Sequence, residues 1–576
     1  MKIGKNWLKK PPIKVVCYTS VILNSFCFLL GIFYLLFPFH LILWDVFGIL
    51  LLIAFFENLI LIFIFSNKKN GRSKLTTRMN LFSYAYLIFI IIANVCMMLG
   101  NLLISVNYSN QLIDNLLGYS LISLAYFGTM IIGIIYAAFG SITYHRINLG
   151  IESNSFEKRF SLKFIKAKKT IKKIIMVISR VTFIIGIIFG IVILFGSFEF
   201  VTTFIAIVSG QFGIFFSIIF SANTILLLKL KHPQWDSDKF HRTALCGILV
   251  SGLLLTPLAS TQYTINNIER NFSTTFGSDW KEKISPEVEN FFLETPFSLS
   301  SYFLGTPPLE CKIERDILFY DSEGIKLYFD AYMPLDNDED LPGSNSTIIR
   351  IHGGAWVSGD KGLMNMMQMN KYFAAQGYRV FDIQYGIANN FLYTLDLLTP
   401  NYKKGNFDID DMMRHIGVFT NYLTDNAELY GVNLNSVFIS GGSAGGHLTC
   451  AVALAIASGK YTDIFSANLT IKGLIPFYPA NDLMNFFGIT GRDVFKNPEK
   501  LIESDSPPCL IFQWTHDIIN YFSIAENIRK TYNANTNENC AILWMPFGGH
   551  ASDFYFTGYY NQIFLYYMER FMYLYH

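Results

Sequence analysis

Long apolar runs dominate the first half of the chain. Seven stretches are long enough to cross a hydrocarbon core of about 30 Å as helices. They cover about residues 15–38, 42–66, 81–106, 117–142, 174–197, 201–228 and 243–260. Pro257 near its end makes the last stretch the weakest, and the first exceeds the apolar core of a cleavable signal peptide. The pattern predicts an α-helical transmembrane domain of about seven spans over residues 15–260.

From about residue 310 the apolar runs become shorter and alternate between strand-sized and helix-sized segments. Strands are predicted at 316–320, 325–332, 347–352, 378–384, 436–440, 470–477, 508–513 and 540–545. Helices are predicted at 362–376, 408–427, 444–458, 521–533 and 552–574. This alternation favours an α/β domain at 310–576 with a mostly parallel sheet, entered through an antiparallel hairpin of the first two strands. Residues 261–309 are interpreted as a linker or partial lid.

Basic residues are distributed unevenly between the predicted spans. The tail 1–14 and the connections 67–80, 143–173 and 229–242 are rich in Lys and Arg, whereas the alternate connections contain none. This positive-inside pattern predicts a cytoplasmic N-terminus, so an odd number of spans places the α/β domain on the extracytoplasmic side, at the cell surface or in a lumen. Glu57 lies in mid-span, either at a functional site or as a side chain that pairs helices.

The composition excludes several classes of function. The 576 residues are 52% hydrophobic and only 15% charged, and the net charge of +2 gives no reason to expect a nucleic-acid partner. The 8 cysteines form no CxxC pair and no cluster with histidines, so we expect no metal site, and no cofactor motif is present. Cys509 and Cys540 start neighbouring predicted strands; a disulfide is conceivable there, but two buried thiols are favoured.

A serine within a glycine-rich turn is the first candidate for chemistry. Residues 438–450 read FISGGSAGGHLTC, which places Ser443 in a G-x-S-x-G sequence between a predicted strand and a predicted helix. In this setting a sharp turn lifts the serine hydroxyl above the sheet, and the helix N-terminus stabilises a developing negative charge. The sequence therefore predicts Ser443 as a nucleophile rather than as a small residue in a bend.

An oxyanion hole is predicted after the third strand, in His352-Gly353-Gly354-Ala355-Trp356. Two successive glycines let backbone N–H groups face a substrate carbonyl, and the N–H of Ala444, next to the nucleophile, would add a further donor. His352 is interpreted as a residue that shapes this loop rather than as a catalytic base.

The base and the acid are sought near the ends of the last strands. His550 lies between the last predicted strand and the last helix, where it can reach the serine; His447 and His516 are the competing histidines. Asp517 ends the preceding strand, and Asp482 is the alternative acid. The chain order Ser…Asp…His at successive strand ends indicates a hydrolytic triad.

Residues 310–576 resemble the α/β-hydrolase superfamily, and within it the esterase and lipase group related to hormone-sensitive lipase. The resemblance implies a nucleophile, acid, base and oxyanion donors at Ser443, Asp517, His550, Gly353, Gly354 and Ala444. The loop reads HGGAW where many relatives have HGGG, a variant seen among formamidase-like and prenylcysteine methylesterase-like members. Residues 391–407 read as a local insertion lining the site. The membrane half resembles no family that we can name.

Three functions follow from these observations. The leading hypothesis is a membrane-anchored serine hydrolase that cleaves carboxylic esters, with lipid esters among the candidate substrates and the lipid bilayer as its partner. An acyltransferase or amidase could use the same triad. A third hypothesis is a transporter or sensor whose outer domain only binds a ligand, but a complete triad disfavours it.

Overall fold

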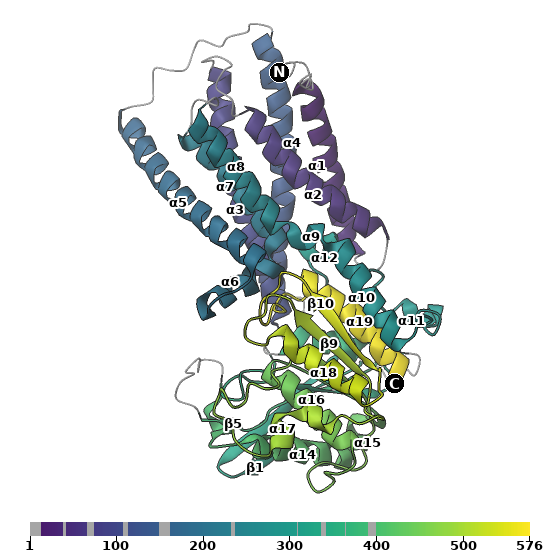
Figure 1. Cartoon of the computed structure of the whole chain (residues 1–576). Coiled ribbons are helices and arrows are strands. Elements are labelled where there is room, and N and C mark those ends of the chain that lie inside the picture. Colours follow the sequence, from purple (N-terminus) through teal and green to yellow (C-terminus); the bar gives the residue numbers. More distant parts are fainter. Residues whose placement is uncertain are drawn as a thin grey trace, which may run out of the picture.

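The computed structural model describes residues 13–37, 42–65, 74–107, 113–148, 162–231, 237–307, 309–335, 341–362, 365–389 and 399–576. They form a bundle of long helices followed by an α/β domain at one end of it (Figure 1). The predicted tail 1–14 lies almost wholly outside the described residues, as does much of the predicted insertion 391–407. The predicted fold class, a helical bundle followed by an α/β domain, is confirmed.

Within the described residues, six helices of the bundle are long and apolar enough to cross a membrane. They are α1 (Ile13–Leu36), α2 (Ile42–Phe65), α3 (Lys74–Ser105), α4 (Leu116–Asn148), α5 (Leu162–Phe195) and α7 (Gly213–Lys231). The seventh predicted stretch forms α8 (Asp238–Leu254), whose 17 residues pack beside α7, and the short α9 (Thr256–Ala259). Since α8 rises about 25 Å at about 1.5 Å per residue, it is slightly shorter than an ordinary span.

The stretch predicted as one span at 201–228 is divided in the structure. A separate helix α6 (Phe200–Gln211) precedes α7, with Phe212 between them. A reciprocal cap between Glu199 and Thr202 starts α6. At its end, the carbonyl of Gln211 accepts a hydrogen bond from the Tyr302 hydroxyl at 3.0 Å, and its side-chain oxygen accepts one from Tyr555 N at 3.1 Å. Hydrogen bonds from residues far away in the sequence therefore stabilise the end of α6. The apolar pattern along the chain did not predict that the helix ends there.

Polar side chains join α1 to α2 inside the bundle. Asn24 and Asn58 exchange two side-chain hydrogen bonds, at 3.0 and 2.8 Å. The Thr19 hydroxyl donates to Glu57 Oε1 at 2.9 Å. Hydrogen bonds between apolar helices stabilise their packing. Of the two roles considered for Glu57, the structure therefore supports helix pairing.

The end of α3, which precedes a connection without Lys or Arg, lies at the end of the bundle that carries the α/β domain. Gln368 of that domain donates hydrogen bonds to the carbonyls of Ile104 and Asn107, at 3.0 and 2.8 Å, where α3 ends. The start of α1 lies at the opposite end (Figure 1). The membrane orientation of the two ends, read from the distribution of Lys and Arg, stays a prediction.

The α/β domain contains an eight-stranded sheet in the order β1-β2-β4-β3-β7-β8-β9-β10. Its strands are β1 (Lys312–Ser322), β2 (Ile325–Met333), β3 (Ser346–Ile351), β4 (Arg379–Ile383), β7 (Asn433–Gly442), β8 (Ile471–Phe477), β9 (Cys509–Trp514) and β10 (Cys540–Met545). From β4 to β10 neighbouring strands are parallel, whereas β1 pairs antiparallel with β2 and β2 with β4. Each of the eight predicted strands is present, and the first two form the predicted hairpin.

Helices cover both faces of this sheet. One core contains side chains of α14 (Ile409–Asp425), α16 (Ala444–Ala457) and α18 (Phe522–Ala534); the other contains α13 (Met367–Ala375) and α19 (Tyr559–Tyr575). The shorter elements are α15 (Ala427–Tyr430), α17 (Asp493–Lys496), η3 (Asn401–Lys403), η4 (Pro498–Leu501), β5 (Ile387–Ala388) and β6 (Lys404–Gly405). Parallel strands buried on both faces place their carboxyl ends, and the loops that follow them, along one edge.

The segment between the two halves contains α10 (Thr261–Phe276), α11 (Pro286–Glu289) and α12 (Leu299–Leu304). Phe272 of α10 packs against Tyr567 of α19, with ring centroids 5.2 Å apart. Phe303 of α12 packs against Phe55 of α2 at 5.4 Å. This segment therefore fastens the α/β domain to the bundle through aromatic contacts on both sides.

Candidate active site

Ser443 stands between β7 and α16 in a backbone conformation that few residues adopt. Its φ of 57° and ψ of −120° are unfavourable for a residue with a side chain. The surroundings hold it there: its N–H donates to the carbonyl of Phe477 at 3.0 Å, and its carbonyl accepts from the N–H of Ala480 at 3.2 Å. The predicted strand-to-helix turn is therefore present, and the chain on both sides of it fixes its geometry.

Two of the glycines around Ser443 are required by close backbone contact. A Cβ atom on Gly441 would lie 2.3 Å from the carbonyl oxygen of Ile351, and one on Gly445 would lie 2.1 Å from the same atom. These separations are far below van der Waals contact, so the turn can sit against the end of β3 only when both side chains are absent. This explains why the sequence surrounds one serine with glycine.

The three residues predicted as a triad lie together. His550 Nε2 is 3.1 Å from Ser443 Oγ, and His550 Nδ1 is 2.9 Å from Asp517 Oδ2. The other carboxylate oxygen of Asp517 accepts hydrogen bonds from the N–H groups of Ile519 and Asn520, both at 2.9 Å. The Asp517 side chain is fully buried, whereas that of His550 is 14% exposed. These contacts allow Asp517 to orient the imidazole while His550 remains accessible from the side of the serine.

The competing candidates for the catalytic base and the acid lie elsewhere. His447 points along α16, where its Nε2 is 3.2 Å from the carbonyl of Lys496, and burial lowers the pKa of its imidazole to about 4. His516 faces Gly196 at the end of α5. The alternative acid, Asp482, is exposed, whereas Asp517 contacts the imidazole directly. Of these candidates, the structure groups Asp517 and His550 with Ser443.

The glycine loop predicted as an oxyanion hole lies beside the nucleophile. A Cβ atom on Gly353 would be 3.5 Å from Ser443 Cβ and 2.7 Å from the carbonyl oxygen of Gly442. Gly354 has a φ of 120°, which turns the loop. Within the described part of the chain, neither Gly353 N nor Gly354 N donates a hydrogen bond, and Ala444 begins α16. These backbone donors are placed where an anionic oxygen on a carbon attached to Ser443 Oγ could accept from them.

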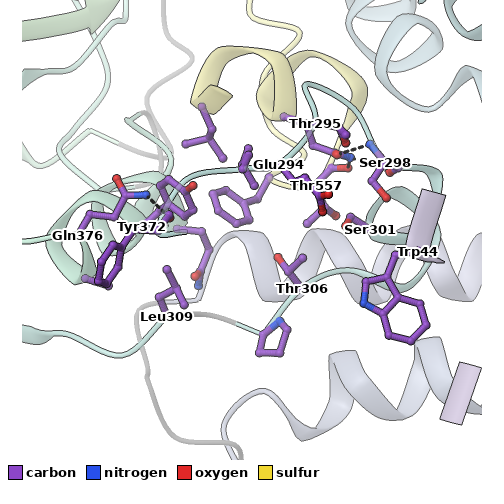
Figure 2. Close-up of a pocket in the computed structure, with 18 of the residues that line it drawn as sticks. Trp44, Glu294, Thr295, Ser298, Ser301, Thr306, Leu309, Tyr372, Gln376 and Thr557 are labelled. Atoms are coloured by element: carbon purple, nitrogen blue, oxygen red, sulfur yellow. Dashed lines mark hydrogen bonds between the residues drawn. The ribbon is translucent and has the colours of Figure 1, made fainter. Parts of the chain in front are cut away.

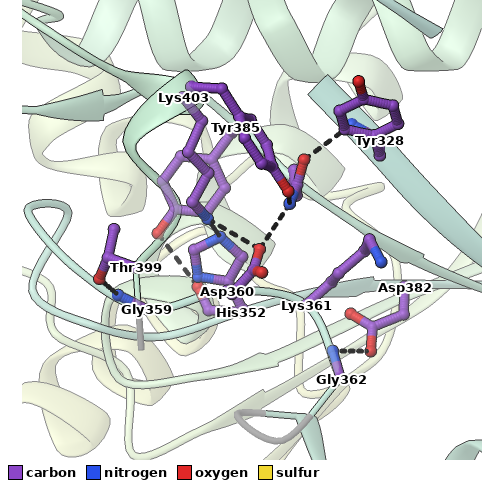
Figure 3. A network of polar contacts seen from close by, with 12 residues as sticks. Tyr328, His352, Gly359, Asp360, Lys361, Gly362, Asp382, Tyr385, Thr399 and Lys403 are labelled. Carbon is purple, nitrogen blue, oxygen red and sulfur yellow. Dashed lines mark hydrogen bonds and ion pairs between the residues drawn. The ribbon is translucent and has the colours of Figure 1, made fainter. Parts of the chain in front are cut away.

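His352 supports this loop from behind, within the polar network of Figure 3. Its ring stacks on Tyr385 with centroids 4.4 Å apart; Nδ1 is 2.7 Å from the carbonyl oxygen of Gly353, and Nε2 is 2.9 Å from Lys403 Nζ. Burial and the neighbouring Lys403 charge hold the pKa of His352 well below its usual value. A neutral imidazole that accepts from Lys403 at Nε2 donates from Nδ1 to Gly353, which fixes the orientation of the loop carbonyl.

Lys403 is a buried cation that the sequence did not single out. Its Nζ lies 3.2 Å from Asp360 Oδ1, and burial lowers the pKa of the Lys403 ammonium to about 8. Asp360 in turn accepts a hydrogen bond from Gln384 Nε2 at 2.6 Å. The predicted insertion thus contributes a side chain behind the oxyanion loop. Only its end at 399–407 lies within the described residues.

A tyrosine and an aspartate next to the imidazole were also missed. The Tyr478 hydroxyl lies 3.2 Å from both carboxylate oxygens of Asp553, and the Tyr478 ring packs edge-on against His550 at 5.0 Å. Burial raises the pKa of Asp553 to about 6, against the lowering effects of the Tyr478 hydroxyl and the Arg350 charge. Both residues follow strand ends, as the triad does, but no spacing rule distinguishes them from other loop residues.

The bundle contacts the loop that carries His550. A Cβ atom on Gly549 would lie 2.6 Å from Ala206 Cβ of α6, and one on Gly210 would lie 3.0 Å from the carbonyl oxygen of Phe547. Phe547 itself packs against a cluster of α5, α7 and α8 side chains. The histidine loop is therefore seated on helices of the membrane half, beside α6, which extends from the end of α5 along the α/β domain (Figure 1).

The cysteines and acidic residues offer no second type of chemistry at this site. Cys509 and Cys540 are opposite each other on β9 and β10, and both are free, buried thiols. Within the described ranges, no three His, Cys, Asp or Glu side chains come together as metal ligands.

Comparison with known proteins gives relatives for the α/β domain. The profile of a family described as BD-FAE matches residues 329–502. A protein of Mycobacterium tuberculosis, named probable carboxylic ester hydrolase LipM, is 23% identical over 238 residues, which are 38% of this chain and 51% of that protein. The match therefore spans about half the length of this relative. The predicted resemblance to α/β-hydrolase esterases is confirmed for the C-terminal half.

Solved esterase structures are also similar to part of the chain. Thermogutta terrifontis esterase 2 is 19% identical and is matched over 91% of its length and 46% of this chain, with a TM-score of 0.34. Esterase B of Lactobacillus rhamnosis is 22% identical, matched over 80% of its length and 43% of this chain, also with a TM-score of 0.34.

Proposed function

We propose that this chain is a membrane-anchored serine hydrolase that cleaves carboxylic esters through an acyl-serine intermediate. The observation that carries the proposal is the position of His550, whose two ring nitrogens contact Ser443 Oγ at 3.1 Å and Asp517 Oδ2 at 2.9 Å. An imidazole held between a serine hydroxyl and a buried carboxylate is the arrangement that activates a serine for acyl transfer.

In the first half of the reaction, Ser443 Oγ attacks the ester carbonyl carbon while His550 Nε2 takes the hydroxyl proton. The carbonyl oxygen becomes an oxyanion and accepts hydrogen bonds from the N–H groups of Gly353, Gly354 and Ala444. Asp517 stabilises the imidazolium that forms. The C–O bond to the alcohol then breaks as His550 returns the proton to the leaving oxygen, and the acyl group remains on Ser443.

In the second half, His550 takes a proton from water, and the resulting hydroxide attacks the acyl-serine carbon. The same backbone donors stabilise the second oxyanion. The bond to Ser443 Oγ breaks and the serine recovers its proton from His550, which releases the carboxylic acid. The neutral, buried His352 takes no proton in this scheme; its part is to hold the glycine loop in place.

We further propose that the bundle crosses a membrane with the N-terminus in the cytoplasm, which places the hydrolase domain on the extracytoplasmic side. The six long apolar helices and the distribution of Lys and Arg support this topology. An odd number of crossings requires α8 to cross as well. Its position beside α5 and α7, antiparallel to α7 along the bundle, is consistent with that role (Figure 1).

The substrates that this geometry favours are esters of lipids in the adjoining bilayer. One side of α6 faces the histidine loop through Ala206 and Gly210, while the opposite side presents Val201 and Phe204, which are 63% and 48% exposed. Phe198, before α6, is 68% exposed. Exposed apolar side chains at the end of a membrane bundle bury themselves in lipid. Such a surface next to the histidine loop would hold lipid close to the α/β domain.

The proposed function is tested by labelling intact cells that express the chain with a membrane-impermeant fluorophosphonate, which reacts with activated serines. We expect the wild type to be labelled and Ser443→Ala to remain unlabelled at equal expression. Labelling that requires permeabilised cells would contradict the topology but not the nucleophile. Absence of labelling in permeabilised cells as well would contradict the proposed chemistry.

The preference for bilayer esters is tested with Val201→Ser/Phe204→Ser in proteoliposomes. Hydrolysis of an ester lipid in the same vesicle is expected to fall about tenfold, since two apolar side chains no longer enter the lipid. Hydrolysis of a short water-soluble ester is expected to be unchanged. Leu429→Ser is the matched control, because Leu429 is 72% exposed in the α/β domain and lies on α15, away from the bundle. Equal losses on both substrates would overturn this preference.

A further inference from the structure

A cavity lies between the two halves of the chain, apart from the triad. Its volume is about 380 Å³, within the usual range for small-molecule sites. Trp44 and Asp45 of α2 contribute to it, together with the segment 290–309, α13, the residues Phe556 and Thr557, and α19 (Figure 2). Ser443, Asp517 and His550 are not among its lining residues. A molecule bound here would contact the bundle, the connecting segment and the α/β domain together.

The charge of this cavity is negative. Asp45 and Glu294 both line it, and no Lys, Arg or His is found among the described residues of its wall. Glu294 lies within electrostatic range of the Asp45 carboxylate, and the hydroxyl groups of Ser298 and Thr295 face that carboxylate. Two carboxylates that share one cavity repel each other, and a bound cation removes that repulsion. The wall therefore disfavours phosphate, sulfate and carboxylate ligands.

A buried hydrogen-bond donor also points to a ligand. Trp44 is 4% exposed, and its indole Nε1 has no hydrogen-bond partner among the described residues. Figure 2 shows the nitrogen-bearing edge of Trp44 turned towards the cavity. A buried N–H without an acceptor is costly, so an oxygen acceptor on a bound molecule would stabilise this position. The ligand must therefore carry an oxygen atom that accepts this hydrogen bond, as well as a positive charge.

The rest of the cavity wall is suited to an apolar part of a ligand. Phe291, Tyr372, Phe556 and Leu565 line the cavity. Aromatic rings bury apolar groups, and their faces also attract alkylammonium groups. These features together require three parts in one ligand: a positive charge, an oxygen acceptor and a hydrocarbon segment.

We propose that this cavity binds an organic ammonium compound that carries a hydroxyl or carbonyl oxygen and an alkyl segment. The ammonium group lies near Asp45 and Glu294, the oxygen accepts from Trp44 Nε1, and the alkyl segment contacts the aromatic side chains. A membrane lipid with an ammonium head group and a soluble alkylammonium compound share this chemistry. The proposal is independent of the triad and holds whether or not the chain is an esterase.

Binding is measured by calorimetry on the full chain in nanodiscs of a galactolipid, which carries no ammonium group, titrated with octyl(2-hydroxyethyl)dimethylammonium. We expect saturable binding that octyl sulfate does not reproduce. Asp45→Asn/Glu294→Gln is expected to weaken it about tenfold. Glu282→Gln/Glu287→Gln is the matched control, because both glutamates are exposed in the same connecting segment and lie outside the cavity wall. Equal affinity for the ammonium and the sulfate, or no effect of the cavity variant, would overturn the proposal.

Further measurements test the role of Trp44, control for folding and distinguish the sources of the ligand. Trp44→Phe is expected to weaken the hydroxyl-bearing probe but not octyltrimethylammonium, which lacks the oxygen; equal losses for both would overturn the role of the indole. Thermal unfolding and soluble-ester hydrolysis of each variant are expected to match those of the wild type. Nanodiscs that contain a cationic dialkylammonium lipid distinguish the sources: competition with the soluble probe identifies a lipid head-group site, and unchanged affinity identifies a soluble ligand.

Discussion

Replacing His550 with Ala is expected to lower kcat for ester hydrolysis by about 10⁶-fold. Without the imidazole, Ser443 Oγ has no acceptor for its proton at 3.1 Å, and the leaving alcohol has no proton donor. The glycine loop and the substrate site remain, so a residual rate above that in water is expected. Initial rates on a soluble ester under saturating conditions give the value directly.

The same measurement of kcat distinguishes Asp517 from Asp482 as the catalytic acid of the triad. Asp517→Asn should reduce kcat by about 10⁴-fold, since an amide cannot stabilise the imidazolium and favours the wrong ring tautomer. Asp482→Asn is the control and is expected to retain wild-type kcat, because Asp482 is exposed and Asp517 holds the imidazole. A Ser443→Ala/His550→Ala double variant should be no slower than either single variant, because these residues act as one unit. Additive losses, or a large loss in Asp482→Asn, would contradict the assignment.

Gly445→Ala is expected to lower kcat/KM by about 100-fold and to lower the unfolding temperature. The added methyl group would lie 2.1 Å from the carbonyl oxygen of Ile351, so β3 or the serine turn must move. A displacement of about 1 Å at a catalytic group costs about 10²-fold, and overpacking next to backbone costs about 1–3 kcal/mol. Kinetics and thermal unfolding of the purified variant measure the two effects separately.

Gly252→Ala provides the control for that substitution. Gly252 lies within α8, and a Cβ atom placed there meets no atom within 4 Å. Alanine is therefore expected to be tolerated, with a small gain in helix stability. If Gly445→Ala kept the wild-type kcat/KM and unfolding temperature, as expected for Gly252→Ala, this would contradict the inference that close contact of Gly445 with β3 positions Ser443.

Much of the architecture could be predicted because it is encoded locally. Apolar runs of span length identify the bundle helices, and strand-sized runs between amphipathic helices identify the sheet. The nucleophile could be predicted for the same reason, since Ser443 and its glycines form one continuous segment. Asp517 and His550 could be located because in parallel strands every carboxyl end lies at one edge, so the residues after successive strands converge.

Residues that act through distant contacts could not be predicted in this way. Lys403 supports His352 only because η3, which ends at Lys403, lies behind the glycine loop. Tyr478 and Asp553 meet beside His550 from two different strand ends. Nothing in the spacing of these residues separates them from the many other polar residues in the loops.

Most helices and strands and the candidate reactive segment can be read from local patterns, because hydrophobic period and turn chemistry depend on near neighbours. The separation of α6 from the predicted span at 201–228 depends on tertiary contacts, because the hydrogen bonds at the end of α6 come from Tyr302 and Tyr555. Close packing of Gly549 on Ala206 then joins the histidine loop to the membrane half. A contact between positions far apart in the chain is a property of the packed molecule, and no local pattern records it.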